Sequence, residues 1–220
     1  MVAIADKKAK WNEAYSDADI ASALPALVLA ENDFVLPLTG GDALDLACGR
    51  AGNAQFLARK GFVVDALDNS EVVLKHLSQF VEEAQLSINP VLRDVEADGL
   101  TDKKYDVIVV SYFLYRDLFP QIIKQLKPNG LLFYQTWASP CEGLEATGPK
   151  SQKFRLQDGE LLSLCAPLKT LFYSENKSLG DTTRGLRNEA MIVAKKKMKR
   201  MPLKTRKDDV HERHEKSQIE

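Results

Sequence analysis

Three aspartates stand at the ends of short apolar runs, where a carboxylate can meet a bound ligand. Asp45 lies in a predicted buried strand that continues into the small residues around Gly49 and then into a helix. Asp68 ends the next apolar run, and Asp94 follows the third. The carboxyl ends of parallel strands meet in the crevice where open α/β sheets bind ligands. We therefore expect the three carboxylates to share one site.

The glycine-containing segment after the first strand reads A-x-G-x-x-G at positions 47, 49 and 52, one substitution from the dinucleotide-binding fingerprint. Asp45 would repel a pyrophosphate but would suit an ammonium group, and S-adenosylmethionine carries an ammonium and a sulfonium and no phosphate. In that interpretation Asp68 accepts hydrogen bonds from the ribose hydroxyls. Asp94 accepts one from the adenine amino group, with Val95 beside the ring.

The elements that must position these acids alternate between apolar strands and amphipathic helices, which predicts an α/β fold with a parallel sheet covered on both faces. Residues 7–37 predict one or two helices that form a cap, and residues 139–151 predict a long loop. Strands are predicted over 43–47, 63–67, 90–92, 105–111, 131–137, 170–174 and 189–194, and helices over 53–60, 70–84, 118–126 and 158–165.

Residues 42–194 resemble the class I S-adenosylmethionine-dependent methyltransferases. The run Leu-Asp-Leu-Ala-Cys-Gly ending at Gly49 resembles the first motif of that family, and the turn Lys-Pro-Asn-Gly ending at Gly130 resembles the turn before its fifth strand. The resemblance implies a Rossmann-like, seven-stranded, mostly parallel sheet with helices on both faces. The implied sheet ends in an antiparallel hairpin, with the seventh strand between the fifth and sixth. Ala47 and Ala51 depart from the family, which usually has glycine there; each adds a methyl group that should leave binding intact.

Within that family, the segments Trp-Asn-Glu-Ala-Tyr over 11–15 and Ser-Tyr-Phe-Leu-Tyr-Arg over 111–116 resemble the branch of tellurite-resistance and thiopurine methyltransferases, which act on small, soft acceptors. The expected cofactor is S-adenosylmethionine. The residues expected to bind it are Asp45, Ala47, Gly49, Asp68, Asn69, Asp94, Val95, Ser111 and Trp11.

The segment after the fourth predicted strand should line the acceptor pocket. Tyr112 and Arg116 are expected to be catalytic; Tyr112, Tyr115, Arg116, Trp137 and Arg155 are expected to bind the substrate. Arginine presents planar paired donors that suit an anionic acceptor, and an aromatic face attracts a sulfonium. For Arg116 and Arg155 an exposed, ion-paired arginine is the alternative, and for the aromatic residues it is core packing.

The expected mechanism is direct in-line displacement at the methyl carbon, in which alignment of the two reactants supplies most of the catalysis. A base is needed only if the acceptor must first lose a proton. His76 is expected at the surface, so Tyr112, Tyr115 or a carboxylate would have to serve. This shortage of bases favours a thiol, a selenol or a similar small acceptor.

Composition and charge limit the other function classes. The net charge of −1 hides a basic segment, 195–220, which we expect to be a disordered tail behind a cap over 1–40 and a cofactor-binding domain over 41–194. The three cysteines are widely spaced, which disfavours disulfides and structural zinc, and no metal site is expected. The chain has no apolar run of the length of a membrane span and no secretory leader, so a cytoplasmic location is expected.

Three other functions stay open at this point. The basic tail could guide an RNA or protein methyltransferase, although its acidic residues from Asp208 onward disfavour nucleic acid. Ala47 and Ala51 could mark a non-catalytic cofactor-binding module. An NAD-dependent dehydrogenase would share Asp68 but has no use for Asp45 or Asp94. The oligomeric state and the acceptor are not readable from the sequence.

Overall fold

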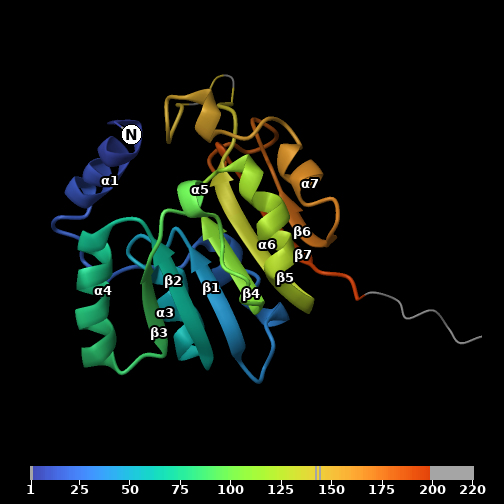
Figure 1. The fold of residues 1–220 in the computed structure, drawn as a ribbon. Helices are drawn as coiled ribbons and strands as arrows, with labels where there is room; N and C mark the ends of the chain where they lie inside the picture. Colours follow the sequence, from blue (N-terminus) through green and yellow to red (C-terminus); the bar gives the residue numbers. More distant parts are fainter. Residues whose placement is uncertain (1, 142, 144, 199–220) are drawn as a thin grey trace, which may run out of the picture.

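Seven strands form one sheet in the order β3-β2-β1-β4-β5-β7-β6 in a computed structural model, which describes residues 2–141, 143 and 145–198 (Figure 1). The first five strands are parallel and β7 runs antiparallel to both neighbours, which confirms the predicted fold. The strands are β1 (Gly41–Leu46), β2 (Phe62–Asp68), β3 (Ile88–Leu92), β4 (Tyr105–Ser111), β5 (Leu126–Trp137), β6 (Lys169–Ser174) and β7 (Glu189–Lys195).

Helices cover both faces of this sheet, because successive strand residues bury apolar side chains on opposite sides. One apolar core lies under α2, α3 and α4, and a second lies under α5, α6 and α7. The helices are α1 (Val2–Ala14), α2 (Leu27–Ala30), α3 (Gly52–Arg59), α4 (Glu71–Ala84), α5 (Val95–Asp98), α6 (Phe119–Gln125) and α7 (Glu160–Leu164).

The structure corrects the predicted elements in three places. The segment predicted to be helical over 7–37 forms α1, an irregular stretch and the single turn of α2. The turn α5 was not predicted; Asp94 caps it by accepting hydrogen bonds from two backbone N–H groups. Strand β5 begins at Leu126 instead of residue 131, because the turn over 127–130 lies inside the strand, where the pairing with β4 shifts register.

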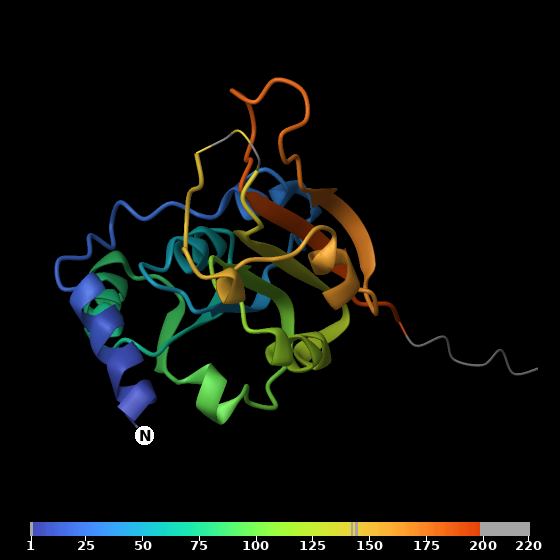
Figure 2. The same cartoon turned by 90° about the horizontal axis from the view of Figure 1, so that it is seen from above.

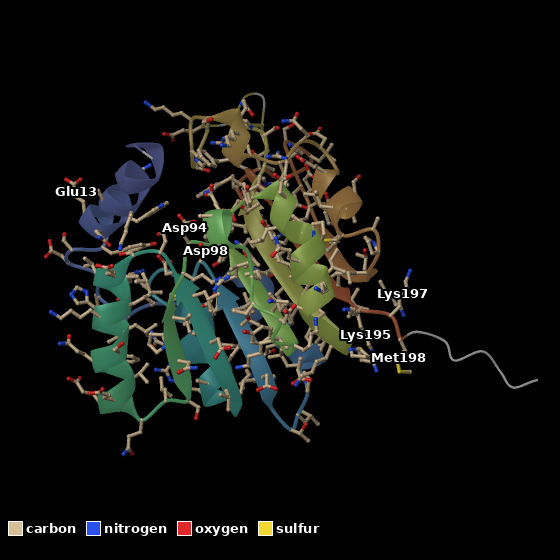
Figure 3. All side chains as sticks on the ribbon, in the orientation of Figure 1. Glu13, Asp94, Asp98, Lys195, Lys197 and Met198 are labelled. Atoms are coloured by element: carbon tan, nitrogen blue, oxygen red, sulfur yellow. The ribbon has the colours of Figure 1, made fainter. Side chains whose placement is uncertain are left out.

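The basic segment leaves the sheet at the end of β7. Lys195 still pairs with Leu131 on β5, and the Nζ of Lys196 donates to the carbonyls of Ile123 and Leu126 at 2.7 Å, so the ordered chain runs past the predicted boundary at 195. Lys195 lies at the amino ends of the parallel strands, and Figure 3 shows Lys195 and Lys197 far from Asp94. The rest of the predicted tail, 199–220, lies outside the described residues.

Two properties of the described residues bear on the function classes considered above. Nowhere in 2–141, 143 and 145–198 does a helix have the length and apolar character needed to span a membrane. In the same part of the chain, no group of three or more His, Cys, Asp or Glu side chains is placed to hold a metal ion.

Candidate active site

A cavity of about 640 Å³ opens at the carboxyl ends of β1 to β4, a volume typical of a small-molecule site. Residues of α1 and of the segment that leads to α2 line it, and Figure 2 shows α1 beside α4. Ten of the predicted site residues line this cavity: Trp11, Ala47, Gly49, Asp68, Asn69, Asp94, Val95, Ser111, Tyr112 and Trp137.

The loop between β1 and α3 forms the floor of the cavity. Ala47 and Ala51 have φ angles of 54° and 59°, in the left-handed region that favours glycine. The two alanines therefore carry backbone strain as well as the extra methyl groups considered from the sequence. A Cβ at Gly49 would lie 2.7 Å from the Tyr15 hydroxyl, and one at Gly52 would lie 2.0 Å from the Leu24 carbonyl oxygen. The floor is thus closely covered by the N-terminal segment.

Asp68 links the end of β2 to this floor. One carboxylate oxygen accepts from the backbone N–H of Gly49 and the other from that of Ser70, both at 2.9 Å. Burial raises the pKa of Asp68, although these hydrogen bonds act in the opposite direction. Burial and the charge of Asp68 together raise the pKa of the neighbouring Tyr15 to about 12. Each carboxylate oxygen has a further lone pair, so Asp68 can accept from two ligand hydroxyls.

Asp94 is held in a similar way at the end of β3. Its Oδ1 accepts from the N–H groups of Glu96 and Ala97 at 3.0 and 3.2 Å. Figure 3 shows Asp94 at the edge of the sheet below α1. Val95 is buried beside it and lines the same cavity. The pair offers an acceptor next to an apolar surface, as a purine ring with an amino group requires.

Asp45 is not among the cavity-lining residues, contrary to the expectation that it contacts the ligand. Its carboxylate lies under the start of α3, where it accepts from the Ala54 N–H at 3.0 Å and from the Asn53 amide at 3.2 Å. Burial raises its pKa to about 7. Asn53, which the sequence did not single out, lines the cavity and also donates to Ser111 and accepts from the Ala26 N–H.

These contacts can be tested against the cofactor that the sequence suggests. A pyrophosphate would need free N–H groups and positive potential at the start of α3, but the Ala54 N–H is already bonded to Asp45. The cavity lining instead includes the carboxylates Asp68 and Asp94, with the apolar Val95 next to Asp94. This set of hydrogen-bond acceptors fits a cationic nucleoside such as S-adenosylmethionine.

Helix α1 forms the lid over the same end. The indole of Trp11 stacks on the Tyr15 ring with centroids 5.8 Å apart. Asn12 accepts a hydrogen bond from Ser70, the N-cap of α4, and Lys8 forms an ion pair with Glu71. The predicted cap therefore contributes residues to the cavity wall.

Tyr112 and Trp137 stand together at the other end of the cavity, with ring centroids 5.0 Å apart. Tyr112 has a φ of 53°, an unusual backbone conformation for a bulky residue. Strained residues of this kind cluster at functional sites. Its side chain is 48% exposed, so the ring faces the open cavity.

Two buried polar residues behind Tyr112 were not predicted. The amide nitrogen of Gln135 donates to the Tyr112 hydroxyl at 3.0 Å and to the Glu189 carboxylate at 2.7 Å. Gln135 also accepts from the Val28 N–H at 2.8 Å. Their signal in the sequence is a polar residue at one end of an apolar run: Gln135 follows residues 131–134 in β5, and Glu189 precedes residues 190–194 in β7.

The structure does not bring the predicted arginines into the cavity. Arg116 forms a paired salt bridge with Glu160, with N–O distances of 2.6 and 2.9 Å, and donates to two carbonyls of the 153–155 segment. Arg155 is 2% exposed and donates to the carbonyls of Pro149, Ala138 and Thr147. Both guanidinium groups are engaged in holding the loop after β5. Tyr115 packs against the core on the α6 side, also away from the cavity.

Comparison with known proteins agrees with this architecture. A family model described as "Tellurite resistance protein TehB" matches residues 15–195. The crystal structure of TehB from Haemophilus influenzae superposes with a TM-score of 0.65 at 22% identity, covering 85% of this chain and 67% of that one. A SAM-dependent methyltransferase from Methanosarcina mazei superposes with a TM-score of 0.60 at 15% identity, covering 80% of this chain and 100% of that one.

Among curated sequences, the ubiquinone biosynthesis O-methyltransferase of Coxiella burnetii is 31% identical over 106 residues, which are 46% of this chain and 45% of that protein. The chain thus spans about half the length of the curated relatives it matches. The family model covers most of the chain, including every strand of the sheet. The chain therefore belongs to the TehB family and has the class I S-adenosylmethionine-dependent methyltransferase fold.

Proposed function

We propose that this protein transfers a methyl group from S-adenosylmethionine to a small-molecule acceptor. One observation carries the proposal: Asp68 and Asp94, each fixed by two backbone N–H groups, face the cavity that the β1–α3 loop floors. Membership of the TehB family supports it. When bound, the cofactor supplies a methyl group on a positively charged sulfur.

The residues of this chain have three tasks in that reaction. Asp68 accepts from the ribose hydroxyls, and Asp94 with Val95 holds the adenine. Asp45 contributes through Asn53 and the start of α3, because its side chain does not line the cavity. The rings of Tyr112 and Trp137 line the acceptor end, exclude water and hold the acceptor in line with the methyl carbon. Such alignment can lower the activation free energy by about 7 to 11 kcal/mol in the most favourable cases.

The acceptor that we favour is a soft one, a thiol or a selenium or tellurium species. The described cavity lining has aromatic rings at the acceptor end, and Arg116 and Arg155, the two residues expected to bind an anion, are engaged elsewhere. The family description, tellurite resistance, agrees with such an acceptor. The Coxiella relative is an O-methyltransferase by name, so hydroxyl acceptors belong in the same screen.

The test is an acceptor screen over thiols, selenite, tellurite, thiopurines, phenols and small acids that follows release of S-adenosylhomocysteine. We expect turnover with at least one small acceptor, and we expect Asp68→Ala to abolish it. Turnover restricted to RNA or protein substrates would contradict the proposal. The structure gives such substrates little support, because β7 ends at the amino ends of the parallel strands, whereas the cavity lies at their carboxyl ends; Figure 3 shows Lys195 and Lys197 far from Asp94.

A further inference from the structure

The hydrogen bonds behind Tyr112 have a fixed direction. The side-chain oxygen of Gln135 accepts from the backbone N–H of Val28, a group that can only donate. The amide nitrogen must therefore be the end that faces Tyr112 and Glu189. Its two hydrogens are both used, one toward the Tyr112 hydroxyl and one toward the carboxylate. The Gln135 amide is 1% exposed and cannot flip without breaking the bond to Val28.

This direction fixes what the Tyr112 hydroxyl can do. A hydroxyl has one hydrogen to donate and two lone pairs. One lone pair accepts from Gln135, and the hydrogen is left to face the Glu189 carboxylate, which accepts from the same amide nitrogen. The second lone pair is left for the cavity, which the half-exposed ring lines. A ligand atom that meets Tyr112 there must therefore bring a hydrogen of its own.

Glu189 is a buried carboxylate at the cavity end of β7, opposite Trp137 on β5, and 8% exposed. Tyr112, from the end of β4, is the titratable side chain that faces it, while its neighbours Gln135 and Trp137 carry no charge. Burial raises the pKa of Glu189. Burial and the nearby negative charge of Glu189 raise the pKa of Tyr112 to about 12. A proton that enters this pair therefore rests on the carboxylate and leaves the phenol neutral.

We propose that Tyr112, positioned by Gln135 and Glu189, removes the proton of a protic acceptor, so that the substrates of this site are thiols or other X–H nucleophiles. The acceptor proton moves to the Tyr112 oxygen while the hydroxyl proton of Tyr112 moves to the Glu189 carboxylate. The electron pair left on the acceptor atom forms the bond to the methyl carbon, and the pair of the breaking carbon–sulfur bond stays on sulfur. The negative charge of Glu189 and the positive charge of the sulfonium disappear together.

This inference rests on the proposed function and adds the proton path and the substrate class. Tyr112 is the catalytic residue, because it touches the acceptor. Gln135 and Glu189 act through it and are positioning residues. If the three residues were purely structural, they would stabilise the β4–β5–β7 end of the sheet. The effect of replacing them on activity would then not depend on the acidity of the acceptor.

The test compares two thiols that each carry a phenyl ring but differ in acidity. At neutral pH 4-nitrothiophenol is already ionised, whereas phenylmethanethiol keeps its proton. We expect Tyr112→Phe and Glu189→Gln to lower kcat/KM for phenylmethanethiol by about 100-fold or more, the usual contribution of a general base. The same variants should change kcat/KM for 4-nitrothiophenol by less than about threefold, and the loss with phenylmethanethiol should shrink as the pH approaches the pKa of that thiol.

A matched control lies on the neighbouring strand, where the Tyr173 hydroxyl donates to Glu175 outside the cavity. Tyr173→Phe removes the same hydroxyl from a tyrosine–carboxylate pair and should leave both kcat/KM values unchanged. A second readout needs no turnover: ultraviolet difference titration of tyrosinate, Tyr112→Phe against wild type, should place Tyr112 near pH 12. Glu189→Gln should lower that pKa.

Each outcome decides the matter. An equal loss with both thiols, no loss with either, or an unmoved Tyr112 pKa in Glu189→Gln would overturn the inference. So would the absence of turnover of both thiols by a chain that binds S-adenosylmethionine. If the chain does not bind the cofactor at all, the proposed function itself fails, and calorimetry separates that case from the others.

Discussion

The two ends of the cavity are built in different ways. At the β1–β3 end, backbone N–H groups hold the carboxylates that face the cavity: Asp68 bridges two loops, and Asp94 caps α5. At the β4–β5–β7 end, side chains hold one another, with Gln135 between Tyr112 and Glu189. An end fixed by the backbone can change little without loss of the fold, whereas side chains can be exchanged. The difference explains how one fold keeps its cofactor while acceptors vary.

The largest effect should come from removing a backbone-held acid. Asp68→Ala should weaken binding of S-adenosylhomocysteine by at least about 100-fold, because two hydrogen bonds to a charged group contribute about 1.5 to 3 kcal/mol each. Isothermal calorimetry measures it. Asp65→Asn is the matched control: Asp65 lies on the same strand but bonds Lys103, Tyr105 and Asn89 away from the cavity, so affinity should stay unchanged. Equal losses in both variants would contradict the distinction.

The second effect concerns the acid buried under the loop. The pKa of Asp45 is about 7 in the folded chain against an ordinary value near 4. Below pH 4 it is protonated in both states; as the pH rises from 4 to 7 only the unfolded chain releases the proton. The contribution of Asp45 to the free energy of unfolding therefore falls over this window, by about 4 kcal/mol, and is level above it.

Urea unfolding of wild type and Asp45→Asn at a series of pH values measures this. The variant should lose that part of the pH dependence, although it sacrifices one hydrogen bond at every pH. Asp68 and Glu189, whose pKa values are also raised by burial, contribute slopes of the same sign that remain in both proteins. Parallel pH profiles for the two proteins would show that Asp45 is ionised in the fold near pH 4, contrary to this account.

The two ends of the cavity also differ in how well the sequence predicts them. The β1–α3 loop, Asp68 and Asp94 occur in continuous segments at strand ends, so the strand pattern placed them together. The place of β7 between β5 and β6, which the family resemblance implied, was confirmed. Gln135 and Glu189 are far apart in sequence and meet only because β7 inserts beside β5. No local sequence pattern indicates that these two side chains lie together.

The predicted arginines lie outside the cavity lining for a related reason. Residue type indicates that Arg116 and Arg155 can bind an anion, but it does not tell which anion or carbonyl is nearest. In the fold, the guanidinium groups donate to Glu160 from α7 and to carbonyls of the loop after β5. Which partner saturates an arginine depends on tertiary packing that periodicity does not contain.

A smaller effect should follow from crowding the floor of the cavity. In Gly52→Ala the new Cβ would lie 2.0 Å from the Leu24 carbonyl oxygen, so the backbone must move. We expect a loss of about 1 to 3 kcal/mol in the free energy of unfolding, typical of overpacking, together with weaker cofactor binding, because residues 23–27 line the cavity. Gly61→Ala, whose Cβ meets nothing within 4 Å, should leave affinity unchanged. Unaltered binding by Gly52→Ala would indicate that the N-terminal segment is not part of the site.

The smallest effect should come from the arginine outside the cavity. Arg116→Ala and Glu160→Ala should each lower the free energy of unfolding by about 1 kcal/mol, as expected for a partly exposed salt bridge. The double variant should cost little more than either, which a double-mutant cycle in urea measures. If Arg116→Ala raised the KM of the acceptor while Glu160→Ala did not, Arg116 would belong to the acceptor site after all.

The most direct test of the central claim is a calorimetric titration of the protein with S-adenosylmethionine. The account predicts saturable binding at one site per chain, with quenching of the tryptophan fluorescence, since both tryptophans of the chain line the cavity. It also predicts that Asp68→Ala removes both signals. The absence of binding at millimolar cofactor by the folded wild-type protein would contradict it.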